Sequence, residues 1–279
     1  MRPAGLPPPS RLSVREIAAL LGGEVDERWL RRLSRDARAG VRRLAAQALR
    51  RRARGERERA RLEALLAVEQ ACRAEGFVRV AGVDEAGVAP LAGPVVAAAV
   101  ILPEGALVHL PGLNDSKVLP ADRRAALYAA LLACGARVGL GVADVGEIDR
   151  LNILQATRLA WRRAVLQLQP PPDFVLVDGR YRLDLPLPQE ALVDGDARCA
   201  AIAAASIVAK VTRDAIMREL DARYPGYGFA LHKGYATRAH VAAIRRLGLT
   251  PEHRRSFLTV RVLQEPLFPE LDGDGRAPR

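Results

Sequence analysis

The sequence predicts an α/β domain of five strands flanked by helices, with a helical extension in front of it. Short apolar runs alternate with stretches of helical periodicity from Phe77 onward, which is typical of this fold class. Before Phe77, apolar residues recur at roughly helical spacing among many arginines. Clusters of proline and glycine separate the segments, as expected at turns. We therefore expect an extension over residues 1–76, a main domain over residues 77–260 and a disordered tail over residues 261–279.

The extension starts with a proline-rich segment and continues as helix. Ser13 and Glu16 have the spacing of a capping box, which predicts the start of a short helix. A second helical stretch is expected from about residue 27 to 72, broken near Gly40 and Gly55. Residues 1–76 hold 18 Arg and 10 Asp/Glu, so 18 − 10 = +8 of the total charge of +11. Two interpretations stay open, a surface that holds a nucleic-acid backbone and a helical hairpin with solvated arginines.

The main domain opens with two apolar runs that predict neighbouring strands. Residues 80–83 end in Asp84 and Glu85, and residues 94–102 follow a turn rich in glycine and proline. Prolines mark the start of one later helix and the end of another. The further strands are expected at 136–143, 174–177 and 191–193. Helices are expected at 121–134, 197–220 and 237–247, and helical segments over 145–169.

Three of the expected strands are followed by acidic residues: Asp84 with Glu85, then Asp178, then Asp196. Strand ends are where α/β sheets bind ligands. Carboxylates beside an apolar core are costly unless a cation compensates them, and oxygen-only ligand sets suit Mg²⁺ or Mn²⁺. A solvated acidic pair in a hairpin turn is the alternative for Asp84 and Glu85. Four carboxylates in a basic protein favour phosphodiester hydrolysis with two metal ions.

Charge and composition narrow the class of partner. The net charge of +11 and the pI of about 10.5 favour a polyanion, either nucleic acid or an anionic membrane surface. No run approaches the roughly 18 to 20 apolar residues of a membrane span, and N-terminal prolines interrupt any signal peptide. The cysteines, at 72, 134 and 199, lack the spacing of a disulfide framework or a zinc site. We therefore expect a cytoplasmic protein that does not enter the membrane.

Only three of the 43 basic residues are lysine: Lys117, Lys210 and Lys233. Arginine fills the other basic positions, so lysine is expected where a compact ammonium group is required. Each lysine lies in a distinctive local sequence, NDSK, AASIVAK or HKGY. The three are therefore candidate site residues, although Ser206 and Lys210, at i and i+4, are also compatible with a purely structural helix face.

Several motifs in order resemble bacterial ribonuclease HII. They are AGVDEAG (81–87), PLAGPVVAAAVIL (90–102), LNDSK (113–117), NILQAT (152–157), VLVDG (175–179), GD (195–196), AASIVAKVTRD (204–214), HKGYAT (232–237) and HRRSF (253–257). The resemblance implies a ribonuclease H-like fold with a five-stranded mixed sheet. It implies endonucleolytic cleavage of RNA paired with DNA, or of ribonucleotides embedded in duplex DNA, leaving 5′-phosphate and 3′-hydroxyl ends. We expect a monomer.

The resemblance also assigns roles to residues at matching motif positions. It implies that Asp84, Glu85, Asp178 and Asp196 are the catalytic carboxylates and hold two Mg²⁺ or Mn²⁺ ions. It implies that Tyr235 stacks beside the cleaved junction. The other implied nucleic-acid contacts are Gly87, Val88, Ala89, Asn114, Ser116, Lys117, Ser206, Lys210 and Lys233.

The sequence departs from the family pattern just after the first acidic pair. The family has a glycine–basic–glycine triplet there, which meets the ribose 2′-hydroxyl and a phosphate, but this chain has Gly87, Val88 and Ala89. Asp194 stands where a lysine is common. We expect weakened recognition of single ribonucleotides with hydrolysis retained. A ribonuclease HIII-like hybrid nuclease and a catalytically weak hybrid-binding protein are the alternatives.

Overall fold

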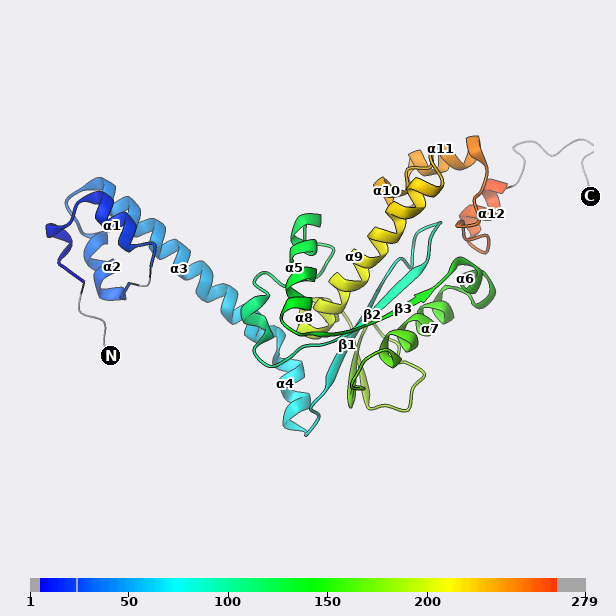
Figure 1. Cartoon of the computed structure of the whole chain (residues 1–279), viewed down its shortest axis with the longest axis horizontal. Helices are drawn as coiled ribbons and strands as arrows, with labels where there is room; N and C mark the ends of the chain where they lie inside the picture. Colours follow the sequence, from blue (N-terminus) through cyan, green and yellow to red (C-terminus); the bar gives the residue numbers. More distant parts are fainter. Residues whose placement is uncertain (1–5, 24, 265–279) are drawn as a thin grey trace, which may run out of the picture. The chain divides into compact units, whose positions relative to one another are not determined.

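The computed structural model describes residues 6–23 and 25–264, which belong to two compact units (Figure 1). The units are Met1–Glu63 and Ala64–Arg279. The division lies ahead of the boundary expected at residues 76 and 77, because helix α4 (Ala67–Ala74) belongs to the second unit. Most of the expected tail, residues 265–279, lies outside the described residues. Residues 261–264 form the end of helix α12 (Leu258–Gln264) and are therefore not part of a disordered tail.

The first unit is helical, as predicted. It contains η1 (Pro9–Arg11), α1 (Val14–Leu20), α2 (Glu27–Ser34) and most of α3 (Ala39–Leu65). The capping box is present, since the Glu16 N–H donates to Ser13 Oγ and the Ser13 N–H donates to the Glu16 carboxylate. A small apolar core joins the three α-helices: Ile17, Leu21, Trp29, Leu30, Leu33, Val41 and Ala45.

Helix α3 runs without interruption through Gly55, so the break expected there is wrong. A glycine inside a helix costs only about 1 kcal/mol relative to alanine. The alanines, leucines and arginines around Gly55 are strong helix formers and offset that cost. The chain does break before α3, near the expected Gly40, and again between α3 and α4.

The second unit is built on a five-stranded mixed sheet, which confirms the predicted fold class. Its strands are β1 (Val80–Ala86), β2 (Val95–Ile101), β3 (Arg137–Ala143), β4 (Phe174–Asp178) and β5 (Gln189–Leu192). Their order in the sheet is β3-β2-β1-β4-β5. The first three strands pair antiparallel, whereas β4 pairs parallel with both β1 and β5. The central position of β1 places its end beside the end of β4.

Helices cover both faces of this sheet, with α7 on one face and α9 on the other (Figure 1). The helical segments expected over 145–169 are two helices divided at Asn152, whose φ of 72° ends one helix while its side chain accepts the Gln155 N–H at the start of the next. The remaining helices of the unit are η2 (Ala106–His109), α5 (Ala121–Ala133), α6 (Val145–Leu151), α7 (Ile153–Leu166), α8 (Gly195–Arg198), α9 (Ala200–Arg223), α10 (Phe229–His232) and α11 (Arg238–Leu247).

Strand β1 and helix α9 approach each other at backbone distance. A Cβ placed on Gly82 would lie 2.2 Å from the carbonyl carbon of Ala201 and 2.3 Å from the Ile202 nitrogen. Only glycine permits this approach. The strand that carries Asp84 is therefore held directly against the first turn of α9.

Among the described residues, we find no helix with both the length and the apolar character needed to cross a bilayer.

Candidate active site

Three aspartates from separate segments converge at the end of the central strands. Asp84 lies in β1, Asp178 is the last residue of β4, and Asp196 lies in the short helix α8. One carboxylate oxygen from each lies within 4.8 Å of the others. Asp84 and Asp196 are buried and Asp178 is half-buried. The parallel pairing of β1 with β4 explains how residues almost a hundred positions apart meet.

Backbone groups fix the orientation of two of these carboxylates. The Glu85 N–H donates to Asp84 Oδ1 at 2.7 Å, and the Gly195 N–H donates to Asp178 Oδ1 at 2.8 Å. Asp194 takes the left-handed conformation with φ of 55° immediately before α8. The turn at Asp194 thereby brings the α8 backbone against Asp178.

Glu85 is set apart from the three aspartates. Its Oε2 accepts a hydrogen bond from Trp161 Nε1 at 2.8 Å, and Trp161 belongs to α7 on the other face of the sheet from α9. Burial raises the pKa of Glu85 to about 7, although the bond from Trp161 opposes this shift. The group of converging oxygens does not include Glu85.

The site is short of positive charge. Burial, together with the charges of Glu85 and Asp178, raises the pKa of Asp84 well above its usual range. Burial and the charge of Asp196 likewise raise the pKa of Asp178. Lys117 Nζ donates to Asp196 Oδ2 at 2.9 Å. Partial burial opposes the charged form of Lys117, but its bond to Asp196 and the surrounding carboxylates outweigh that effect and raise its pKa.

A hard divalent cation fits this arrangement. The converging atoms are all carboxylate oxygens, the ligand type that Mg²⁺ and Mn²⁺ prefer. Burial raises the pKa values of Asp84 and Asp178, and the lysine at this site, Lys117, bonds to Asp196. Positive charge placed between the oxygens would lower both pKa values and stabilise the ionised forms.

The residues expected to contact phosphates fall into two groups. Near the aspartates, Ser116 and Ser206 are buried and their hydroxyl oxygens lie 2.7 Å apart in a mutual hydrogen bond. Asn114 Oδ1 accepts the N–H of Asp115, so that side chain shapes its own turn. Phosphate contacts for Asn114, Ser116 and Ser206 remain predictions.

The second group lies along α9 and the loop after α10. Lys210 Nζ donates to Asp214 Oδ1 at 2.8 Å, and Lys233 Nζ donates to the carbonyl of Ala230. Tyr235 keeps 45% of its surface exposed. In the part of the chain that the structure describes, no hydrogen bond or ion pair links Lys210, Lys233 or Tyr235 to the three aspartates.

A chain of neutral histidines holds the backbone of Tyr235. The Thr250 N–H donates to His253 Nδ1 at 2.9 Å, so the proton of neutral His253 is on Nε2. That nitrogen lies 3.1 Å from His240 Nε2, and His240 Nδ1 lies 2.9 Å from the Tyr235 carbonyl oxygen. Burial lowers the pKa of His253 to about 4, which keeps the ring neutral near pH 7. The chain of bonds therefore has one direction and ends at Tyr235.

Two buried arginines support the loop that follows β1. Arg254 Nη2 donates to the Gly87 carbonyl at 2.5 Å and Arg254 Nη1 donates to the Val88 carbonyl at 2.8 Å. Arg254 also binds the carbonyl of Gly93. Arg213 donates to the carbonyls of Ala92, Pro94 and Lys233. Burial lowers the pKa of Arg213 to about 10 and that of Arg254 to about 9, so both remain charged at neutral pH.

The hydrogen bonds from Arg254 set the direction of the peptide groups of Gly87, Val88 and Ala89. A peptide N–H points opposite to its C=O, so the amides of Val88 and Ala89 point away from Arg254. Val88 and Ala89 are exposed, and neither N–H donates to another described residue. Ala89 does not have a positive φ, so alanine is accommodated there without backbone strain. The sequence contains Arg254 within HRRSF, but its partners are carbonyls, which leave no signal in a sequence.

The comparisons with known proteins agree with this geometry. The family model described as ribonuclease HII matches residues 81–260, and the model for the ribonuclease HII N-terminal domain matches residues 13–73. Ribonuclease HII of Geobacillus kaustophilus is 52% identical over 253 residues, which is 90% of this chain and 96% of that protein.

Solved structures have the same fold in the second unit. The crystal structure of ribonuclease H2 from Pyrococcus horikoshii has a TM-score of 0.57 and 28% identity, and the match covers 67% of this chain and 97% of that one. The crystal structure of Bst-RNase HIII in complex with Mn²⁺ has a TM-score of 0.54 at 19% identity, covering 67% of this chain and 69% of that one, and indicates the fold alone.

Proposed function

This chain belongs to the ribonuclease HII family and is an endoribonuclease, and from that premise we propose its substrate and mechanism. The substrates are the RNA strand of RNA/DNA hybrids and ribonucleotides embedded in duplex DNA. Hydrolysis proceeds by in-line attack of water on a phosphodiester and leaves 5′-phosphate and 3′-hydroxyl ends. The observation that carries the proposal is the convergence of the Asp84, Asp178 and Asp196 carboxylate oxygens within 4.8 Å.

The residues that would hold two Mg²⁺ or Mn²⁺ ions are Asp84, Asp178 and Asp196, with Glu85 as the fourth carboxylate. Bound there, such ions activate water and stabilise the leaving oxygen. The Glu85 N–H orients Asp84, and the Gly195 N–H orients Asp178. Trp161 fixes the Glu85 carboxylate from the opposite face of the sheet. Lys117 neutralises part of the charge of Asp196, so that an anionic phosphate is repelled less.

Recognition of the ribonucleotide rests on the triplet and on Tyr235. Because Val88 supplies no cation, the contact at Gly87, Val88 and Ala89 is made by the backbone alone. Arg254 supports this role, since it turns the Val88 and Ala89 amides outward as hydrogen-bond donors. Tyr235 stacks on the sugar and base beside the cleaved bond. Single ribonucleotides are therefore recognised more weakly than a triplet with a basic residue would allow.

A cleavage assay on three end-labelled duplexes tests the proposal, in Mg²⁺ and then in Mn²⁺. One duplex holds a single ribonucleotide in DNA, one holds a short RNA tract joined to DNA, and one is a full RNA/DNA hybrid. We expect cleavage of all three, with the single ribonucleotide cut most slowly. The Asp84→Asn protein is the control, and its activity should be lost on every duplex.

Each other outcome contradicts a named part of the proposal. Cleavage that does not require a divalent ion would contradict the metal mechanism. Cleavage of the single ribonucleotide at the rate of the RNA tract would contradict weakened recognition. An absence of cleavage by the folded protein would favour the hybrid-binding alternative. The ribonuclease HIII-like alternative is set aside, since the N-terminal match is to the ribonuclease HII N-terminal domain.

A further inference from the structure

Three of the four histidines of the chain gather beside the loop that carries Tyr235. The fourth, His109, is exposed at the end of η2. The rings of His232 and His240 stack with their centroids 4.4 Å apart, and the centroids of His240 and His253 lie 5.2 Å apart. We call His232, His240 and His253 the histidine cluster. Among the described residues, no carboxylate makes a hydrogen bond or an ion pair with the cluster.

His232 holds two backbone groups of this segment. The Gly234 N–H donates to His232 Nδ1 at 3.2 Å, so the proton of neutral His232 is on Nε2. That nitrogen donates to the Tyr227 carbonyl oxygen at 2.8 Å. Gly234 has no room for a side chain, since a Cβ there would lie 2.4 Å from the Ala92 carbonyl oxygen. His232 therefore fixes the residue that precedes Tyr235.

His240 is the member of the cluster that contacts Tyr235. Because His253 donates through Nε2, His240 Nε2 must accept, and His240 donates through Nδ1 to the Tyr235 carbonyl at 2.9 Å. His240 thus has the opposite tautomer to His232 and His253. The Thr237 N–H donates to the same carbonyl at 2.8 Å. Two donors therefore hold the backbone of Tyr235.

The cluster has no position for a further proton. Each ring keeps one nitrogen as an acceptor, and this nitrogen faces an N–H. The donors are the Gly234 N–H at His232, the Thr250 N–H at His253, and the His253 ring N–H at His240. A second proton on any ring would place two N–H groups against each other and break a bond. Burial lowers the pKa values of His240 and His253, which agrees with this geometry.

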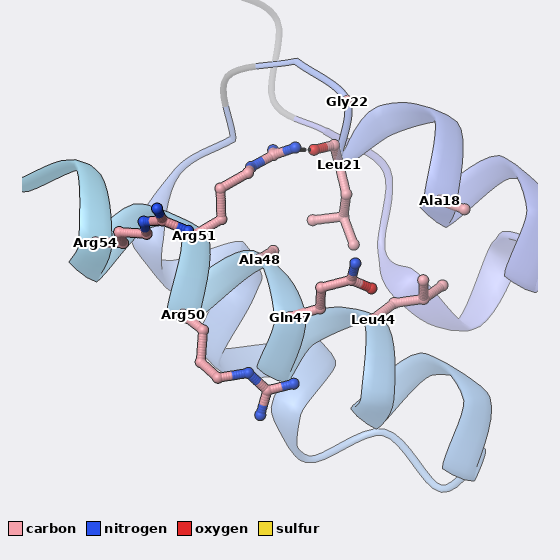
Figure 2. A pocket seen from close by; sticks show the side chains of 9 residues that line it. All are labelled: Ala18, Leu21, Gly22, Leu44, Gln47, Ala48, Arg50, Arg51 and Arg54. Carbon is pink, nitrogen blue, oxygen red and sulfur yellow. Dashed lines mark hydrogen bonds between the residues drawn. The ribbon is translucent and has the colours of Figure 1, made fainter. Parts of the chain in front are cut away.

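Other carbonyls of the chain are held by arginine, and those bonds do not depend on where a proton is placed. Figure 2 shows Arg51 extending to the Leu21 carbonyl in the first unit. Guanidinium nitrogens only donate, so this bond requires no choice of tautomer. An imidazole nitrogen either donates or accepts. The bond to the Tyr235 carbonyl therefore depends on the tautomer that His253 selects in His240.

We propose that the histidine cluster positions Tyr235 for stacking on the substrate by fixing His240 in its Nδ1–H tautomer. The inference rests on the proposed function for the stacking role of Tyr235. This side chain exposes 45% of its surface, and its hydroxyl makes no hydrogen bond to another described residue. The orientation of the ring therefore depends on where the loop holds the Tyr235 backbone. The three histidines act through Tyr235 and are positioning residues.

The tautomers can be measured without cleavage, in the full-length chain labelled with ¹⁵N-histidine. Long-range ¹H–¹⁵N correlation spectra at pH 8 distinguish protonated from unprotonated ring nitrogens. We expect Nδ1–H at His240 and Nε2–H at His232 and His253, with His109 as the exposed reference. In His253→Leu the share of Nδ1–H at His240 should fall, because no donor then faces its Nε2. A predominant Nε2–H tautomer at His240 in the wild type would overturn the proposal.

Two substitutions at His240 separate the hydrogen bond from side-chain volume. His240→Asn places an amide N–H near the position of Nδ1 and keeps the donor, whereas His240→Leu has a similar size and removes it. On a short RNA tract joined to DNA, His240→Leu should raise KM at least about fivefold with kcat nearly unchanged, the low end of the effect of losing one stacked base. His240→Asn should restore most of the wild-type KM, and His109→Leu should leave KM unchanged.

A double-mutant cycle with Tyr235→Ala tests whether His240 acts through the tyrosine. In the Tyr235→Ala background, His240→Leu should change kcat/KM by less than about twofold further. Additive effects of the two substitutions, or equal KM values for His240→Leu and His240→Asn, would overturn the proposal. Circular dichroism shows which variants are folded, and the wild-type tautomers decide the proposal where a variant is not. Failure of the proposed function would be seen separately, as a KM unchanged by Tyr235→Ala with the tautomers as expected.

Discussion

Two clusters of charged residues lie near the end of strand β1, one of aspartates and one of arginines. The charges of the two clusters are compensated in different ways. Asp84, Asp178 and Asp196 face only one ammonium group, and burial raises the pKa values of Asp84 and Asp178. Arg213 and Arg254 face no carboxylate at hydrogen-bonding distance among the described residues but donate to six backbone carbonyls. Backbone carbonyls satisfy the arginine cluster, whereas the acidic cluster has the all-carboxylate ligand set that fits a divalent cation. The difference separates buried charge that is satisfied within the fold from buried charge that is arranged as a candidate site for a cation.

Substitutions in the acidic cluster should lower the cleavage rate more than substitutions in the arginine cluster. Asp84→Asn keeps the shape of the side chain and removes its charge, so cleavage of every duplex should fall by roughly 10³-fold. Single-turnover rates in Mg²⁺ measure this. Asp115→Asn is the matched control, since Asp115 lies near Lys117 but outside the three aspartates. A fall of less than tenfold for Asp84→Asn would remove Asp84 from the reaction.

Substitutions in the arginine cluster should lower the free energy of unfolding more than substitutions in the acidic cluster. Arg254→Met keeps much of the side-chain volume but leaves the Gly87, Val88 and Gly93 carbonyls unpaired. At about 1 kcal/mol for each carbonyl that loses its hydrogen bond, the free energy of unfolding should fall by about 3 kcal/mol. Urea denaturation in Mg²⁺ measures the change.

Arg255→Met is the matched control for that substitution. The neighbouring Arg255 is exposed, and its side chain makes no hydrogen bond to another described residue. Its replacement should change stability by less than about 0.5 kcal/mol. Equal effects of the two substitutions would contradict the role of Arg254 in holding the loop.

Restoring the missing cation should sharpen substrate choice. In Val88→Arg, Ala89→Gly, a charge-assisted phosphate contact worth about 1.5–3 kcal/mol is added. Cleavage at a single ribonucleotide should improve by roughly ten- to a hundredfold relative to a full hybrid. Competition between the two substrates in one reaction measures the ratio. Val108→Arg, at another exposed valine, is the control. An unchanged ranking would contradict the hypothesis.

The smallest expected effect is a change in the free energy of unfolding with pH in the absence of divalent ions. Burial raises the pKa values of Asp84, Glu85 and Asp178, and that of Glu85 reaches about 7. Between about pH 4 and 7 the folded chain therefore binds more protons than the unfolded chain. The stability that these groups contribute must therefore fall as pH rises through that window.

Urea denaturation in EDTA at pH 5, 6, 7 and 8 checks this sign. The lowered pKa of His253 makes the folded protein more stable as pH rises towards about 6.5, which opposes the effect of the carboxylates. To separate the two effects, the wild type is compared with Asp84→Asn. The variant should be the more stable protein at pH 8, and Mg²⁺ should remove its advantage. Greater stability of the wild type in EDTA at pH 8 would contradict the charge deficit.

The sheet could be predicted because its signals are local. The apolar runs that form β1, β2 and β4 are buried on both faces, so they read as uninterrupted apolar sequence, and the acids that follow them mark the site. The position of the break at Asn152, within the helical segments expected over 145–169, could not be predicted because its positive φ produces it. The continuity of α3 through Gly55 was missed because one glycine is a weak break signal.

The supporting contacts could not be predicted, because one partner in each is a backbone group or a distant side chain. Arg254 binds carbonyls more than 150 residues away in the chain. Buried Glu69 of α4 accepts the Ala201 N–H at 2.7 Å in the first turn of α9, which ties α4 to the second unit. Ser116 and Ser206 were expected at phosphates, but pairing between their hydroxyls depends on the fold.

The contact between Gly82 and the backbone of Ala201 has a consequence for entropy. Because two main chains touch there, the position of Asp84 relative to α9 does not depend on adaptable side chains. A cation that binds between the aspartates then orders little that is still mobile, so its binding loses little conformational entropy. Amide hydrogen exchange along β1 should accordingly be slow before Mg²⁺ is added and change little afterwards.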